Sequence, residues 1–247
     1  MTTTIGMRFK DGIILAADQE ISFGDSKFQE EKIFAIDDIQ QWKVFIGYAD
    51  TPSLAKEAVE RIREHLLALD KSFDIQVKGK KEGTLYEDRE REITNTDIRR
   101  VAEEVLNTMA TRQYNPLALQ LLIVGVGCRE LPEMWIYDAQ GFLTAGDFQP
   151  LAMGNLSIVQ HLKVMYSRRD TLEIGENLAV YLMSKAATKL SGTGLPIDVV
   201  SISNHGWWKW MQPKEFQERL IKMEAQEKAI LRQLILGSYP DVSPTLP

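Results

Sequence analysis

The segment from Thr2 to Asp18, with the sequence TTTIGMRFKDGIILAAD, decides the kind of fold that this chain can adopt. In its first half, apolar residues alternate with polar or small residues, at Ile5, Met7 and Phe9. This period of two predicts a strand with one buried face. The second half is a continuous apolar run over residues 13–17, which predicts a strand buried on both faces. Two such strands joined by a short turn predict an antiparallel hairpin.

The turn of this hairpin is predicted at Asp11-Gly12, because Asp-Gly is a favoured two-residue hairpin loop. That turn pairs Lys10 with Ile13 and, further along, Ile5 with Asp18. Thr2 then lies three residues along from the partner of Asp18, at ~10 Å by the rise of a strand. We therefore expect no direct contact between Thr2 and Asp18, and a lysine side chain between them could touch both.

The rest of the chain continues with strands and helices. Further strands are predicted at residues 32–36, 42–48, 119–126, 133–137, 142–145, near 151, 197–202 and 207–211. Apolar stripes with helical spacing predict helices at 52–69, 95–109, 156–167, 172–190 and 213–236. The second of these helices is predicted to begin at Asn95 or Thr96, both good N-caps. Residues 19–31 are polar and are expected to turn, and the charged run 87–92 is expected to be a solvated surface segment.

This order of elements predicts an α+β fold. Strands joined by hairpins imply antiparallel sheets, and the helix pairs between them imply helices on the outer faces. Two stacked sheets between helix layers bury every apolar surface, so we predict a four-layer α/β/β/α sandwich. We expect one domain over residues 1–212 and a C-terminal helical extension with a loose tail over residues 213–247.

The composition excludes several classes of protein. The chain has 247 residues, 29 Lys and Arg against 35 Asp and Glu, and a formal net charge of −6, which argues against nucleic acid as a partner. Its single cysteine, Cys128, excludes a disulfide framework, and three scattered histidines leave little for a metal centre. No apolar stretch has the ~20 residues that a spanning helix needs. The N-terminus lacks the pattern of a secretory signal, so we expect none. We expect a cytoplasmic protein without membrane contact, metal or cofactor.

Four positions could carry chemistry, and each has a plainer alternative. If Met1 is removed, Thr2 carries a free α-amine with an ordinary pKa of about 7.7–8.0, so the threonine hydroxyl has its own base; the alternative is a β-prone strand start. Lys32 opens an apolar strand, where it either pairs with a carboxylate or reaches solvent. Asp18 ends a buried strand and needs a partner, for which Lys32 is the obvious choice. Gly47 could offer its N–H to an oxyanion or be a turn or bulge glycine.

Together these positions resemble the β-subunits of proteasomes, which belong to the N-terminal nucleophile (Ntn) hydrolases. The resemblance is dense over residues 2–49, in TTTIG (2–6), KDGIILAAD (10–18), EKIFAID (31–37) and IG (46–47). It continues more weakly at AMG (152–154) and LSGTG (190–194). Residues 70–93 and 213–247 have no clear counterpart in that family. The Ntn-hydrolase fold is itself an α/β/β/α sandwich, in agreement with the order of elements.

The resemblance implies a role for each matching residue. Thr2 matches the nucleophile, Asp18 and Lys32 the charged pair beside it, Gly47 the oxyanion donor, and Ser191 a serine that hydrogen-bonds near the terminal amine. It also implies that the side chains at three positions contact substrate, at Ile21, Phe45 and Ala49. The bulky ring of Phe45 is expected to fill the specificity pocket and to favour small or medium substrate side chains.

This sequence departs from the family pattern at three positions. Asn155 replaces a serine, Thr188 an aspartate and Glu20 a residue that is commonly basic. The first two changes weaken the network that orients the amine.

The resemblance implies a threonine peptidase that acts on peptides or unfolded proteins within a homo-oligomeric ring. No long propeptide precedes Thr2, so self-cleavage is not expected to be needed. The alternatives are a small-molecule amidase of the same superfamily and a catalytically silent shell subunit. A retained Met1 would favour the silent subunit, because Thr2 would then lack a free amine.

Overall fold

Two antiparallel sheets face each other in the computed structural model, which describes residues 3–23, 26–38, 41–78, 92–111, 119–138, 140–146, 148–151, 164–189 and 194–236. The chain divides into two compact units, Met1–Met211 and Gln212–Pro247. The first unit contains both sheets. The second contains helix α5 (Pro213–Leu236).

The first sheet is built around the N-terminal hairpin. Its strands lie in the order β10 (Phe148–Leu151), β1 (Thr4–Phe9), β2 (Gly12–Asp18), β11 (Ile197–Ser203) and β12 (Trp208–Trp210). Every residue of β2 is buried, as the continuous apolar run predicts. Strand β2 therefore lies in the middle of the sheet, between β1 and β11.

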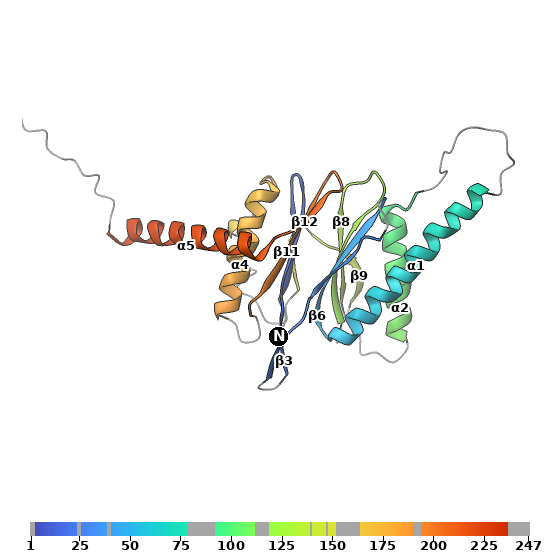
Figure 1. Ribbon diagram of the computed structural model, residues 1–247, viewed down its shortest axis with the longest axis horizontal. Helices are drawn as coiled ribbons and strands as arrows, with labels where there is room; N and C mark the ends of the chain where they lie inside the picture. The colour runs from blue at the N-terminus through green and yellow to red at the C-terminus, as the bar shows by residue number, and fades with distance from the viewer. Residues whose placement is uncertain are drawn as a thin grey trace, which may run out of the picture. The chain divides into compact units, whose positions relative to one another are not determined.

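The second sheet places β6 beside β5 and β7. Its order is β5 (Ile33–Ile36), β6 (Lys43–Asp50), β7 (Leu119–Val126), β8 (Glu133–Asp138) and β9 (Gly141–Thr144). Between the two sheets in sequence lies a separate hairpin of β3 (Glu20–Phe23) and β4 (Ser26–Gln29), which projects beyond the sheets (Figure 1).

Helices cover the outer face of each sheet (Figure 1). Helices α1 (Pro52–Lys78) and α2 (Asn95–Thr111) pack on the second sheet and bury apolar residues of β6 and β7. Helix α4 (Leu172–Lys189) packs on β2 and β11 of the first sheet. A second apolar core fills the space between the sheets, with Leu15, Phe45 and Leu122 among its members. These four layers confirm the predicted α/β/β/α sandwich.

The predicted register of the N-terminal hairpin is wrong by two residues. Phe9 pairs with Gly12 and Ile5 with Ala16, so Lys10 and Asp11 form the turn. Gly12 lies within β2, where a Cβ atom would stand 2.1 Å from the carbonyl oxygen of Ile202 on β11. The glycine therefore permits close approach of the neighbouring strand and does not form the turn.

Two local predictions also need correction. Thr94, rather than Asn95 or Thr96, caps α2, because its Oγ1 accepts a hydrogen bond from the N–H of Asp97 at 3.2 Å. Residues 20–23 and 26–29 pair as the β3–β4 hairpin, two strands that the prediction for residues 19–31 did not include. The predicted helix at 156–167 and the charged run 87–92 lie largely outside the described residues.

Candidate active site

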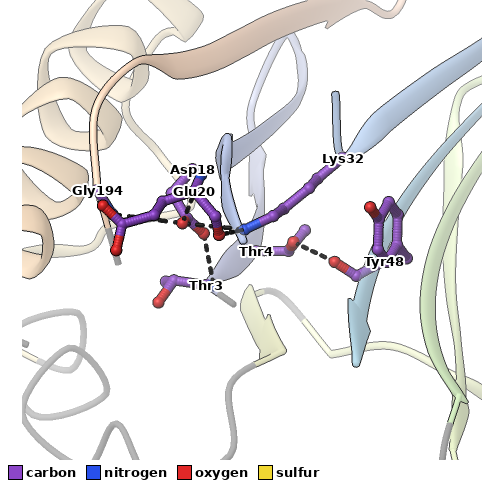
Figure 2. Close-up of polar contacts among 7 residues, drawn as sticks. All are labelled: Thr3, Thr4, Asp18, Glu20, Lys32, Tyr48 and Gly194. Atoms are coloured by element: carbon purple, nitrogen blue, oxygen red, sulfur yellow. Dashed lines mark hydrogen bonds and ion pairs between the residues drawn. The ribbon is translucent and has the colours of Figure 1, made fainter. Parts of the chain in front are cut away.

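Asp18 is the centre of a buried polar cluster at the end of β2 (Figure 2). Its Oδ1 accepts a hydrogen bond from the N–H of Thr3 at 2.7 Å. Its Oδ2 lies 3.0 Å from the ammonium of Lys32 and accepts the N–H groups of Glu20 at 3.2 Å and Gly194 at 3.4 Å. The carboxylate therefore joins four segments of the chain, three of them through backbone amides.

Lys32 approaches this cluster from the residue just before β5. Both Lys32 and Asp18 have 0% exposed side chains, which confirms the predicted burial and pairing. The ammonium also donates to the carbonyl oxygen of Glu20. Figure 2 shows the Lys32 side chain extended towards Asp18 and Glu20. The ammonium is therefore held by a carboxylate and a backbone carbonyl oxygen, without exposure to solvent.

Burial controls the protonation of the pair. Loss of water raises the pKa of the Asp18 carboxyl above its ordinary value, against the opposing effects of Lys32 and of the backbone donors Thr3 and Gly194. Loss of water likewise lowers the pKa of Lys32, against the attraction of Asp18, Glu20 and Glu30. Burial thus opposes the charged form of both groups, and their mutual attraction favours it.

Gly47 lies opposite the start of β1, in the space between the sheets. A Cβ atom at this position would stand 2.6 Å from the Thr4 Cγ2 atom and 3.9 Å from the Lys32 carbonyl oxygen. The Thr4 hydroxyl donates to the carbonyl oxygen of Tyr48 at 2.8 Å, and the N–H of Tyr48 donates to the carbonyl oxygen of Lys32 at 3.1 Å. The absence of a side chain at Gly47 therefore lets β1 approach β6 beside Lys32.

The other expected catalytic positions are only partly described. Thr2 and Ser191 lie outside the described residues, as does Asn155. Thr188 is described, and its hydroxyl donates to the carbonyl oxygens of Ser184 and Lys185 on its own helix. The roles of Thr2, Gly47 and Ser191 stay predictions.

Two of the expected substrate contacts are buried between the sheets. Phe45 is fully buried, and its ring meets the ring of Trp208 edge-on at 5.5 Å. Ala49 belongs to the same core. The side chain of Ile21 lies outside the described part of the chain, although its backbone belongs to β3. The substrate contacts of these residues stay predictions.

Sequence reasoning missed three contributors to the cluster. Thr3 and Gly194 donate backbone amides to Asp18, and Glu20 contributes both an amide and a carbonyl. Glycine at position 194, in the SGTG motif of residues 191–194, was the available sequence signal. The backbone groups of Thr3 and Glu20 carry no such signal, because any residue offers them.

The described side chains offer no obvious metal centre. Among them there is no group of three or more histidine, cysteine, aspartate or glutamate residues that could hold a metal ion. No helix in the described ranges is both long enough and apolar enough to span a bilayer.

Comparisons with known proteins agree with this geometry. Residues 1–202 match the family described as Proteasome subunit. A proteasome subunit beta 2 from Caldivirga maquilingensis is 25% identical over 207 residues, which cover 83% of this chain and 92% of the relative.

Solved structures show the same fold. The Anbu protein from a Hyphomicrobium species has a TM-score of 0.71 at 15% identity and covers 97% of this chain and 100% of its own. A helical assembly of the Anbu complex from Pseudomonas aeruginosa has a TM-score of 0.64 at 13% identity, with 94% and 96% of the two chains covered. With most of its length matched, the chain belongs to the proteasome subunit family.

Proposed function

We propose that this chain is a threonine hydrolase that cleaves peptide bonds through Thr2 after removal of Met1. One observation carries the proposal: the buried Asp18–Lys32 pair binds the N–H of Thr3, the residue to which Thr2 is joined. A cluster of this kind is costly to bury and has to be held by several partners. Membership of the proteasome subunit family supplies the hydrolase chemistry that such a cluster suits.

The proposed mechanism uses groups of this chain alone. The α-amine of Thr2, directly or through a water molecule, takes the proton from the threonine hydroxyl. The oxygen then attacks the amide carbonyl, and the N–H of Gly47 stabilises the oxyanion. Lys32, held by Asp18, supplies the positive field, and Ser191 hydrogen-bonds near the amine. Collapse of the tetrahedral intermediate breaks the C–N bond, and the protonated α-amine of Thr2 returns its proton to the departing amine. Water then hydrolyses the acyl-enzyme and restores the Thr2 hydroxyl.

A matched pair of substitutions tests the nucleophile. Thr2→Ala removes the hydroxyl and is expected to abolish hydrolysis of fluorogenic peptides, whereas Thr2→Ser keeps a hydroxyl and should retain measurable hydrolysis. The mass of the purified N-terminus and circular dichroism are recorded for each variant. Equal rates for Thr2→Ala and the parent would reject this mechanism. A processed parent without hydrolysis of peptides or of small amides would instead favour a silent shell subunit.

We also propose a homo-oligomeric ring, in which helix α5 lies at or near a subunit contact. Three large apolar residues of α5 are exposed, at Ile221, Ile230 and Leu231. The Pseudomonas aeruginosa relative forms a helical assembly. Head-to-tail contacts between identical subunits close into a ring or continue as a helix, depending on the rotation between neighbours.

Light scattering and electron microscopy test this assembly. The full chain and a chain cut after Met211 are compared across a concentration series. Rings for the full chain and smaller species for the cut chain are expected. A full chain that is monomeric at tens of micromolar would reject the ring, and unchanged assembly after the cut would reject the role of α5.

A further inference from the structure

The backbone of Glu20 contacts both members of the buried Asp18–Lys32 pair. Its N–H donates to Asp18 Oδ2 at 3.2 Å, and its carbonyl oxygen accepts from the Lys32 ammonium. These contacts depend on where β3 begins and not on the identity of the side chain. The position of the Glu20 backbone therefore helps to fix the geometry of the pair.

The Glu20 side chain fills a space that Gly194 leaves open (Figure 2). A Cβ atom on Gly194 would stand 2.1 Å from Glu20 Oε2, 2.7 Å from its Cδ and 2.9 Å from its Cβ. The backbone of Gly194 is not in the left-handed region, so its conformation alone does not require glycine. The contact with Glu20 explains the absence of a side chain at this position.

Gly194 in turn donates its N–H to Asp18 Oδ2 at 3.4 Å. A chain of contacts thus runs from the Glu20 side chain through Gly194 to Asp18 and Lys32. We infer that Glu20 is a positioning residue whose side chain, by its shape, holds Gly194 against Asp18 and so orients Lys32. The catalytic consequence rests on the proposed function, whereas the packing contact does not.

This inference gives a reason for one departure from the family pattern. Glu20 stands where a basic residue is common, and its carboxylate lies over Gly194. Glutamine shares the shape of this side chain and lacks its charge, so Glu20→Gln separates the effect of shape from that of charge.

A double-mutant cycle on stability tests the contact without any need for activity. Gly194→Ala is expected to lower the thermal unfolding midpoint, because the new methyl group has to displace Glu20. Adding Glu20→Ala to the Gly194→Ala variant removes two of the three close contacts and should restore part of the decrease in the unfolding midpoint. Gly146→Ala is the matched control, since no atom lies within 4 Å of its Cβ position, and it should leave the midpoint unchanged. A double variant no more stable than Gly194→Ala would overturn the inference.

Peptide hydrolysis tests the positioning role. Glu20→Ala should lower kcat between about tenfold and 100-fold with little change in KM, because small misplacements of catalytic groups have effects of this size. Glu20→Gln keeps the shape and should restore kcat. Equal losses for Glu20→Gln and Glu20→Ala would overturn a role based on shape. A parent without hydrolysis would contradict the proposed function, and the stability cycle would still decide the contact.

Discussion

Two ion pairs among the described residues lie in opposite environments. Arg63 on α1 donates two hydrogen bonds to Asp38, at 2.6 Å and 3.0 Å, yet the two side chains are 41% and 40% exposed. Lys32 contacts Asp18 at a single distance of 3.0 Å, and both side chains are fully buried. By distance alone, the surface pair has the better geometry.

The surroundings of an ion pair, more than its N–O distance, decide how much it contributes to stability. Water competes for the surface charges, so breaking an exposed pair has little effect on stability. Inside the sandwich, removal of one partner leaves an unpaired charge and unpaired donors with no access to water. The buried pair therefore fixes the relative positions of β2, β5 and the Gly194 segment, whereas the surface pair joins α1 to the segment after β5 in contact with water.

Breaking the buried pair should give the largest effect. We expect Lys32→Met to destabilise the fold by about 3–5 kcal/mol, as is typical when one member of a buried pair is removed. Adding Asp18→Asn should recover part of this loss, because the lone carboxylate charge is then removed while an acceptor oxygen remains. Chemical denaturation of the parent, single and double variants measures both effects. A single variant as stable as the parent would contradict the burial of this pair.

Gly47→Ala should give the next largest effect. The added methyl group would stand 2.6 Å from Thr4 Cγ2, and overpacking of this kind costs about 1–3 kcal/mol. Thr4→Ser removes that methyl group and keeps the hydroxyl that bonds Tyr48, so the double variant should recover stability. The same denaturation measurements check this result. No recovery in the double variant would mean that the glycine is needed for another reason.

Asp198→Asn should have a smaller effect on the stability of the fold, and this effect should depend on pH. Burial raises the pKa of the Asp198 carboxyl above its ordinary value of 3.8, although Gln19 donates a hydrogen bond to Oδ1 at 2.8 Å. Above pH 3.8 the unfolded chain releases the carboxyl proton, whereas the folded chain still holds it. The stability due to this group is therefore fully present below pH 3.8 and is lost as the pH rises through the raised pKa of the folded chain.

Denaturation of the parent and of Asp198→Asn between acidic and neutral pH measures this loss. The advantage of the parent over the variant should decrease as the pH rises. An advantage that increases with pH would show that the fold lowers the pKa of this carboxyl instead.

Asp38→Asn should have the smallest effect on stability, because both side chains of the Asp38–Arg63 pair are accessible to water. We expect an unfolding midpoint within experimental error of the parent, in low and in high salt. The comparison with Lys32→Met has to be made under the same conditions. A loss as large as that of Lys32→Met would refute the explanation by burial.

Some parts of the site could be predicted from the sequence because their signals are local. Lys32 and Asp18 are charged residues at the ends of apolar strands, where a buried charge has to be paired with an opposite charge. The β3–β4 hairpin was missed, although Glu20-Ile21-Ser22-Phe23 alternates with a period of two, because its residues are mostly polar. The contact of Phe45 with Trp208 could not be predicted, because it follows from the packing of distant strands.

Most strands, most helices and the four-layer order follow from the sequence, because the spacing of apolar residues along a segment shows which faces must be buried. The hairpin register, in which Asp18 lies beside Thr3 rather than Ile5, depends on the tertiary structure. The tertiary structure also decided that Gly194, 176 residues from Asp18, completes the cluster. A backbone amide looks alike at every position in a sequence, so its partner is chosen only when distant strands come together.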